Sequence, residues 1–390
     1  MKPMSSFAAS LLFVTPLFAA ELRLQPQPVV VHEWGTFTSI ASENGNPVQW
    51  APLSGTADLP CFVASLVGNS GSATFKDRAS GLVRMETPVL YFYSQTPAAL
   101  SVRVGFPQGW ITEWYPKATA VTPAFPRVAP TSGFTGGEIR WDDVRVMPGQ
   151  NPELPISKNP SHYFAARNTD SAPLQVGKQW EKLIFYRGVG DFAVPLQPVL
   201  TKDGRVKITN NGTEAIPLMI LFENRAGKVG YRLATGSKTA ATELEFPELG
   251  STVDQLRTAL ASHLVEFGLY RKEADAMIET WRDSWFEEGM RLFYIVPREM
   301  VDRVLPLDVQ PVPSSTARVF VGRIELLSPA MRETIEAASA AGDTRKLEGL
   351  GRFLGPFVMQ MERTSPGRER PAAVQALFSK PRPSSGSCVQ

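Results

Sequence analysis

The chain has 390 residues, of which 43% are hydrophobic and 20% charged, a composition typical of a globular protein. Its 40 Lys and Arg residues nearly balance 38 Asp and Glu residues, which gives a net charge of +2. This balance offers no electrostatic reason to expect a nucleic acid or an anionic membrane as partner. The length predicts two domains, or one large sheet domain with a helical part.

The first twenty residues (1–20) carry the pattern of a cleavable export signal. Lys2 provides a positive charge, residues 7–14 form a short apolar run, and Ala19 with Ala20 forms a small-residue cleavage site. This run is shorter than the ~20 apolar residues that span a bilayer, and no other transmembrane candidate follows. We therefore expect cleavage near Ala20 and a periplasmic or secreted protein without an integral membrane segment.

From residue 28 to 246 the chain consists of short β-prone runs separated by Gly- and Pro-containing turns. This pattern favours an antiparallel β-sandwich-like domain over βαβ units. The candidate strands are 28–40, 82–94, 99–107, 110–115, 137–147, 180–188, 206–209, 215–224 and 229–234. Residues 95–98 and Asn210-Asn211-Gly212 each predict a hairpin between the strands that flank them, and Gly227 predicts a further turn.

Near residue 250 the apolar spacing becomes helical. Ser251 and Asp254 predict a capped helix start, and apolar residues three and four apart continue to Gly289, with Gly268 as a break. The segments expected next are strands at 292–297 and 317–327, a helix at 298–304, a helix from Ser328-Pro329, and helix over 345–362. The interval 251–362 is thus a helical and mixed α/β part, and the tail 364–390 is expected to be disordered.

Only two cysteines are present, Cys61 and Cys388. In an exported protein they can form a disulfide that ties the tail to the body, and the alternative is a buried Cys61 with a free Cys388. Two cysteines are too few for a structural zinc site. No motif in the sequence indicates a cofactor.

The candidate catalytic residues are three carboxylates in aromatic, apolar strands, Glu33, Glu86 and Glu113. A buried carboxylate needs a partner, because an unpaired interior charge is costly. One interpretation makes two of them the acid and the base or nucleophile of a polysaccharide hydrolase. A second joins them to His32 in a metal site. A third pairs them with Arg84, Arg103 or Arg187, which would hold the sheets together.

His32 and Glu33 are adjacent in the segment VVVHEWGTF, an arrangement that suggests an acid/base or metal site. Neighbouring residues in a regular strand point to opposite faces. We therefore expect His32 and Trp34 on one face and Glu33 with Phe37 on the other, unless Gly35 marks a bulge. Because the three histidines are far apart in the chain, we predict no metal site.

The candidate binding residues are His32, Trp34, Trp110, Trp114, Tyr115, Asp283, Glu287 and Arg291. The aromatic segment 110–115 is expected to be exposed and to contact a partner. Asp283 and Glu287 form a like-charged pair near a helix C-terminus, which is unfavourable unless cations such as Arg291 neutralise it. Either a salt-bridge network that docks the helices on the sheet or a polar cleft at the domain junction accounts for this pair.

The strings VHEWGTFTSI, ETPVLYFYS, FPQGWITEWYP and SWFEEGMRLFYIVPRE resemble signatures of a family of exported bacterial proteins that is known only from sequence. The resemblance runs over most of residues 29–327. It implies no activity, ligand or fold.

The sequence predicts a β-rich α+β fold and leaves two functions of different class. The first is a non-enzymatic exported module that binds a polysaccharide or protein partner. It is favoured because no GxSxG, HExxH, Walker or GxGxxG motif stands in a usable context. The second is a glycosidase-like hydrolase of envelope or environmental polysaccharide that uses two of the three glutamates.

Overall fold

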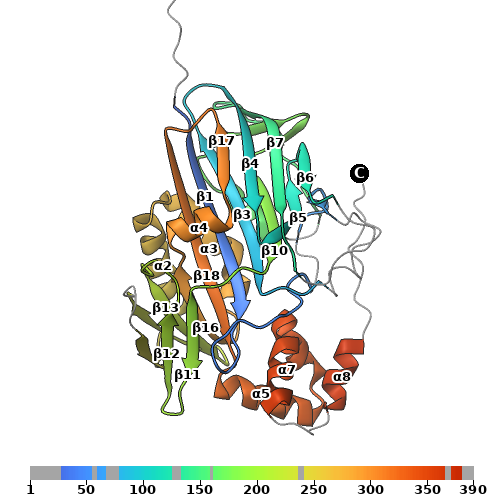
Figure 1. Cartoon of the computed structure of the whole chain (residues 1–390), viewed down its shortest axis with the longest axis vertical. Coiled ribbons are helices and arrows are strands. Elements are labelled where there is room, and N and C mark those ends of the chain that lie inside the picture. Colours follow the sequence, from blue (N-terminus) through green and yellow to red (C-terminus); the bar gives the residue numbers. More distant parts are fainter. Residues whose placement is uncertain are drawn as a thin grey trace, which may run out of the picture.

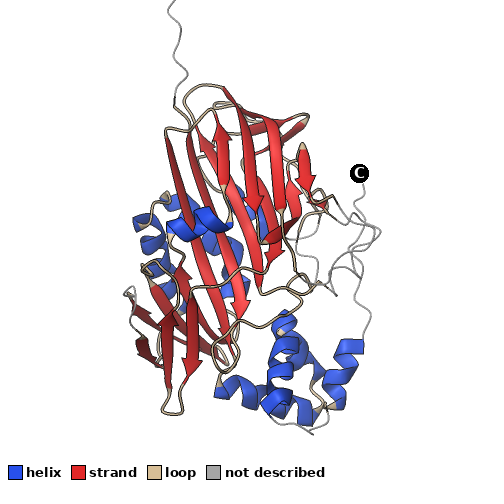
Figure 2. Cartoon of the chain, in the orientation of Figure 1, coloured by secondary structure: helices blue, strands red, loops and turns tan. Residues whose placement is uncertain are grey.

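The computed structural model describes residues 28–54, 59–66, 79–124, 133–158, 161–235, 241–364 and 370–379. The predicted export signal and Cys388 lie outside these residues, so export and the identity of the partner of Cys61 stay predictions. Cys61 itself is exposed and disulfide-bonded, so the alternative of a buried Cys61 is wrong. Strands dominate the described chain (Figure 2), and most of its helices come after residue 250 in the sequence. The predicted β-rich fold with antiparallel sheets is confirmed.

A nine-stranded sheet forms the middle layer, in the order β14-β13-β16-β18-β1-β3-β10-β5-β2. Its strands are β1 (Val30–Ile40), β2 (Ala64–Ser65), β3 (Val83–Tyr93), β5 (Gly109–Tyr115), β10 (Ile184–Gly190), β13 (Met219–Arg225), β14 (Lys228–Ala234), β16 (Gly289–Ile295) and β18 (Ser315–Leu326). Strand β18 runs parallel to β1, and every other neighbouring pair is antiparallel. Because β16 and β18 lie between β13 and β1, the intervals 28–246 and 251–362 share this sheet.

Two smaller antiparallel sheets cover one face of the large sheet (Figure 1). The first contains β17 (Leu307–Gln310), β4 (Ala98–Phe106), β7 (Gly137–Val146), β8 (Leu174–Val176) and β9 (Gln179–Glu181), with β6 (Ala120–Thr122) paired to β7. The second contains β11 (Leu196–Leu200), β12 (Arg205–Asn210) and β15 (Thr242–Glu245). Apolar side chains from all three sheets form one sandwich core, which includes Phe37, Phe92, Val104, Trp141 and Ile208.

The opposite face of the large sheet is covered by α2 (Val253–Glu266), α3 (Arg271–Trp285) and the short helix η1 (His162–Arg167). Their apolar sides pack on the sheet in a second core that includes Trp34, Leu260, Met277, Trp285 and Phe293. Gly268 separates α2 from α3 as predicted, and its φ of +116° is one that glycine adopts readily. The N-cap of α2 is Thr252 rather than Ser251, because the Thr252 hydroxyl accepts the Gln255 N–H at 3.2 Å.

A third group of helices lies at one end of the large sheet (Figure 1). It comprises α5 (Pro329–Ala341), α6 (Thr344–Gly349), η2 (Gly351–Phe353), α7 (Leu354–Thr364) and α8 (Ala372–Ser379), which share a core with Ile40 and Trp50. The predicted cap Ser328 accepts the Met331 N–H at 3.2 Å. Helix α8 corrects the expectation of disorder for residues 372–379. Residues 365–369 and 380–390 lie outside the described residues.

Two predicted hairpins are wrong, although the strands themselves are confirmed. Strand β3 pairs with β1 and β10, whereas β4 pairs with β7 and β17 in the facing sheet. The Asn210-Asn211-Gly212 turn likewise leads from β12 in a small sheet to β13 in the large one. In both places the chain crosses between layers, which buries the apolar faces of both strands in the sandwich core. The turn at Gly227 does join a hairpin, β13–β14.

The remaining connection from β16 to β18 runs through α4 (Arg298–Val304), at the position predicted for a short helix. Pro297 precedes this helix, and the Met300 and Val301 N–H groups donate to its carbonyl oxygen at 3.0 and 3.1 Å. The helix buries Met300 and Val301 against the sandwich core. After α4 the chain forms β17 in the small sheet and then re-enters the large sheet as β18.

Candidate functional site

Glu33 points into the sandwich core and is fully buried. Its Oε2 accepts the Arg318 Nε–H at 2.5 Å, and the Tyr186 hydroxyl donates to its Oε1. Arg318 also contacts Asp302 at 2.7 Å. Burial, reinforced by the Glu33 charge, raises the pKa of Tyr186 well above its ordinary value. The arginine partner is therefore Arg318, whereas Arg103, one of the predicted partners, pairs with Glu138.

A bulge decides which face of β3 carries Glu86. The pairing of β1 with β3 shifts by one residue between Trp34 and Thr36, and the extra residue lies on β3, where Thr87 has a φ of 47°. A bulge of this kind re-aims the side chains beyond it. Glu86 consequently pairs in register with Thr36 of β1, and its side chain lies on the helix-covered face of the sheet. The irregularity adds no residue to β1, so the strand alternation predicted there is retained.

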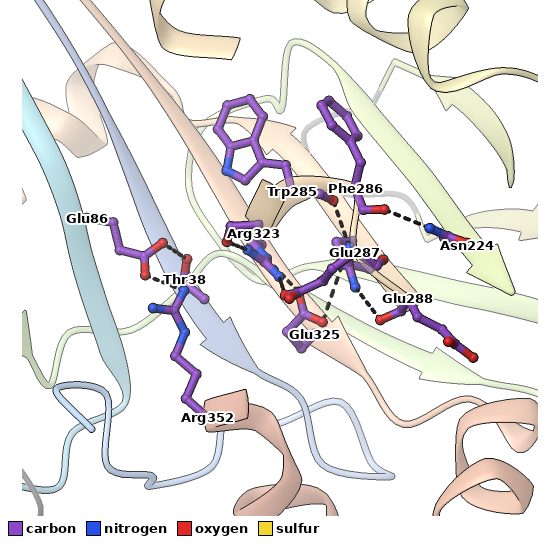
Figure 3. A network of polar contacts seen from close by, with 12 residues as sticks. Thr38, Glu86, Asn224, Trp285, Phe286, Glu287, Glu288, Arg323, Glu325 and Arg352 are labelled. Carbon is purple, nitrogen blue, oxygen red and sulfur yellow. Dashed lines mark hydrogen bonds and ion pairs between the residues drawn. The ribbon is translucent and has the colours of Figure 1, made fainter. Parts of the chain in front are cut away.

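The Glu86 carboxylate is fully buried at the contact with the C-terminal helices (Figure 3). It accepts a hydrogen bond from Thr38 Oγ1 at 2.9 Å and lies 2.5 Å from Arg352 and 3.1 Å from Arg84. Burial alone raises its pKa. The positive charges of Arg352, Arg84 and Arg323 outweigh that effect, so the pKa of Glu86 is lower than its ordinary value.

Glu113 is 2% exposed and accepts the Arg187 Nε–H at 3.0 Å and the Thr112 hydroxyl at 2.5 Å. Two of the three arginines predicted as partners do pair with these glutamates, Arg84 with Glu86 and Arg187 with Glu113. All three candidate catalytic carboxylates are thus buried and neutralised by arginine. A glycosidase needs two carboxyl groups that line one accessible cleft, and Glu33, Glu86 and Glu113 do not provide them.

The residues that follow α3 form a second buried ion network (Figure 3). Arg291 donates to the carbonyl oxygens of Trp285 and Glu287 at 2.7 and 2.8 Å, and its Nε lies 3.0 Å from Glu325. Arg323 bridges Glu325 at 2.5 Å and Glu287 at 2.7 Å. The Arg291 guanidinium therefore provides hydrogen-bond donors and positive charge to the free carbonyl oxygens at the C-terminal end of α3. Of the two predicted alternatives, the structure has the docking network for Glu287, whereas Asp283 is exposed and lies outside it.

The other predicted binding residues are spread over the molecule. Trp34 is fully buried, and Trp110 and Tyr115 are 6% and 3% exposed, so the expected exposure of segment 110–115 is wrong for these two. Trp114 is partly buried against the sandwich core. The Trp110 indole donates to a backbone carbonyl at 2.9 Å, as a buried indole normally does. Asp283 is exposed and lies 3.2 Å from His162.

His32 belongs to a buried cluster at the N-terminal end of α3. Its Nδ1 lies 2.8 Å from Glu273 Oε2, and the Tyr93 hydroxyl donates to Oε1 at 2.7 Å. The Tyr270 backbone N–H donates to the same carboxylate at 2.7 Å. Glu273 is fully buried in the first turn of α3, where the helix dipole favours an anion. Burial, and then the Glu273 charge, raises the pKa of Tyr93 well above its ordinary value.

A polar groove of about 510 Å³ lies along α2 and α3. The residues that line it are Asn168, Asp254, Arg257, Thr258, Ala261, Arg271, Lys272, Asp275, Ala276, Ile278 and Glu279. Its charged groups pair as Arg257–Glu279 at 2.8 Å and Arg271–Asp275 at 2.9 Å, and Lys272 contacts Asp170 at 2.5 Å. Every one of these side chains is at least 34% exposed. We call this feature the α2–α3 groove.

Two exposed apolar side chains stand at the turn beside the groove. Val265 is 39% exposed and Tyr270 is 48% exposed. The Tyr270 ring centroid lies 4.3 Å from that of His32 and 4.9 Å from that of Tyr93, which it meets edge-on. Tyr270 directly precedes Arg271, which lines the groove.

Sequence reasoning identified His32 but missed Glu273, Tyr270 and the groove residues. One usable signal was present for Glu273: it stands three residues after the N-cap of α3, the position from which a Glu side chain accepts the cap N–H. The groove residues were visible only as the polar side of two amphipathic helices, a pattern shared by most surface helices.

The described segments contain no group of three or more His, Cys, Asp or Glu side chains arranged to hold a metal ion. Within those segments, no helix combines the length and apolar character that a bilayer-spanning helix requires. Comparison with known proteins found no family model that matches the chain and no curated protein similar to it.

Proposed function

We propose that the chain is an exported, non-enzymatic binding module that recognises a protein partner through the α2–α3 groove. The observation that carries the proposal is the groove itself, a concave surface of about 510 Å³ between two helices with exposed charged side chains along it. Export rests on the N-terminal sequence pattern.

The charges of the groove favour a polypeptide as partner. Its lining residues carry three positive charges, from Arg257, Arg271 and Lys272, and three negative charges. A balanced set of this kind suits a segment with acidic and basic side chains better than a polyanion. Exposed ion pairs contribute only about 0–1 kcal/mol each, so a partner can replace them at little cost.

A polysaccharide partner has weaker support. Sugar-binding sites stack sugar rings on free aromatic faces. The described residues that line the groove include no aromatic side chain, and the ring of Tyr270 beside it is already packed against His32 and Tyr93. Trp110 and Tyr115, the expected platforms, are buried. The arginine pairing of Glu33, Glu86 and Glu113 likewise speaks against the polysaccharide-hydrolase alternative.

An array of random decapeptides, screened beside an array of glycans, tests the proposal. We expect the protein to select peptides that carry both charge signs, and expect Arg271→Glu to weaken their binding about tenfold. Lys228→Glu is the matched control, because Lys228 is an exposed cation at the start of β14, outside the groove. Binding to glycans alone, or equal effects of the two substitutions, would overturn the proposal.

A further inference from the structure

We infer that Tyr270 is the apolar anchor of this binding surface and that His32, Glu273 and Tyr93 hold it in position. The inference rests on the proposed function and names the chemistry of the partner. The partner is a peptide segment that presents an aliphatic or aromatic side chain to Tyr270, flanked by charges that meet the groove.

Tyr270 is exposed but held from two sides. Its backbone N–H is bonded to the buried Glu273 carboxylate at 2.7 Å, and its ring packs on His32 and Tyr93. His32 and Tyr93 are in turn bonded to Glu273 at 2.8 and 2.7 Å. Both the backbone and the ring of this surface residue are therefore fixed by groups beneath it.

This arrangement gives a reason for burying His32 and Glu273. A buried ionisable pair adds little to stability compared with apolar residues of the same size, and its best-attested use is to specify a geometry. Here the pair lies directly beneath an exposed tyrosine. A side chain that is already ordered loses less conformational entropy when it binds, which increases affinity.

The surroundings of Tyr270 match the anatomy of a protein interface. Tyrosine is among the residues that most often carry binding energy, and such anchors stand in an apolar centre with a polar rim. Val265 is a second exposed apolar side chain, in the last turn of α2, and Arg271 and Lys272 begin the charged rim. The anchor thus stands next in the chain to two residues that line the groove.

The test measures the affinity of the tightest decapeptide from the array by fluorescence anisotropy. We expect Tyr270→Ala to weaken binding about 30-fold or more, the range of interface hot spots. Tyr270→Phe keeps the ring and is expected to stay within about threefold of the unmodified protein, by the same reasoning.

The positioning role is tested with His32→Ala, which removes the ring beneath Tyr270. We expect a loss of affinity of about three- to tenfold. Without the His32 ring, Tyr270 is less ordered in the free protein, so it loses more conformational entropy when the peptide binds. Val319→Ala is the matched control. Val319 is 2% exposed in the same core, so this variant loses stability without touching Tyr270. Equal affinity losses in the two variants would contradict a positioning role.

The failures of the two proposals are distinguishable. If Arg271→Glu weakens binding and Tyr270→Ala does not, the anchor inference is wrong and the groove proposal stands. If neither substitution changes the affinity, or the array yields no binding peptide, both proposals are contradicted.

Discussion

Single residues explain why the glutamates of aromatic strands misled the functional interpretation. A glutamate among aromatic and apolar strand residues can be either a catalytic carboxylate or a carboxylate buried with an arginine, and the local sequence is the same in both cases. Arg318, the partner of Glu33, is 285 residues away in sequence, and Arg352 is similarly remote from Glu86. No local pattern specifies such pairings, so the need for a partner was predictable and its identity was not.

The Glu33–Arg318 pair provides the first prediction. Glu33→Gln removes the buried counter-charge of Arg318 and leaves only the half-exposed carboxylate of Asp302 beside its guanidinium. We expect a loss of about 3–5 kcal/mol in the free energy of unfolding. Guanidinium chloride denaturation measures this loss. The control is Glu248→Gln, at an exposed pair with Arg232 where the expected change is at most about 1 kcal/mol. A cost at Glu33 no larger than the control would contradict the structural role.

Tyr115 provides a prediction about alkaline pH. Burial, and then the charge of Glu181, raises its pKa to about 12 from an ordinary value of 10.0. The folded state therefore favours the neutral phenol. The resulting stabilisation is complete below pH 10 and is lost as the pH rises through about 12. Tyr115→Phe should remove this component, both from the absorbance titration at 295 nm and from the pH dependence of unfolding. If the component that Tyr115→Phe removes has its midpoint near pH 10, the pKa of the Tyr115 phenol is not raised and the prediction is wrong.

At the scale of elements, strand positions were largely predictable and their partners were not. The alternation of β1 correctly separated His32 from Glu33, because the two-residue period is a local property. The β3–β4 and β12–β13 hairpins failed because the turn residues mark a reversal without specifying which sheet receives the next strand. The parallel pairing of β1 with β18 joins chain segments 285 residues apart and has no local signal.

A glycine in β18 shows how tightly these partners fit. Gly322 lies opposite Tyr294 of β16, and a Cβ at Gly322 would approach the Tyr294 ring to 2.0 Å. Gly322→Ala should therefore destabilise the protein by about 1–3 kcal/mol through overpacking. Gly250→Ala is the control, since a Cβ there has nothing within 4 Å. Chemical denaturation compares the two, and equal stabilities would show that the ring moves aside freely.

For the whole molecule, buried ion pairs connect units that are distant in sequence. Glu86 of β3 and Arg352 of the C-terminal helices form one of these contacts, beside the apolar core around Trp50. The fold class was predictable from composition and strand spacing, because these are properties of the chain as a whole. The docking of α5–α8 on the sheet end was not, because it depends on contacts between remote segments.

The Glu86 contact predicts a dependence of stability on acid pH. Its folded-state pKa is lowered from the ordinary 4.5, so its ionisation stabilises the folded protein above that pH, and the stabilisation is lost as the pH falls below 4.5. We expect the stability difference between the unmodified protein and Glu86→Gln to shrink when denaturation is repeated below pH 4.5. A difference that stays constant from pH 7 to pH 3 would contradict the ion pairing.

The most direct test of the proposed function is amide hydrogen exchange with and without the tightest decapeptide from the array. Binding at the α2–α3 groove predicts slower exchange within residues 253–279, with the largest effect at the turn that carries Tyr270. The same experiment with Arg271→Glu should show this protection reduced, and with Lys228→Glu unchanged. Protection confined to other parts of the chain, such as segment 110–115, would contradict the proposed binding surface.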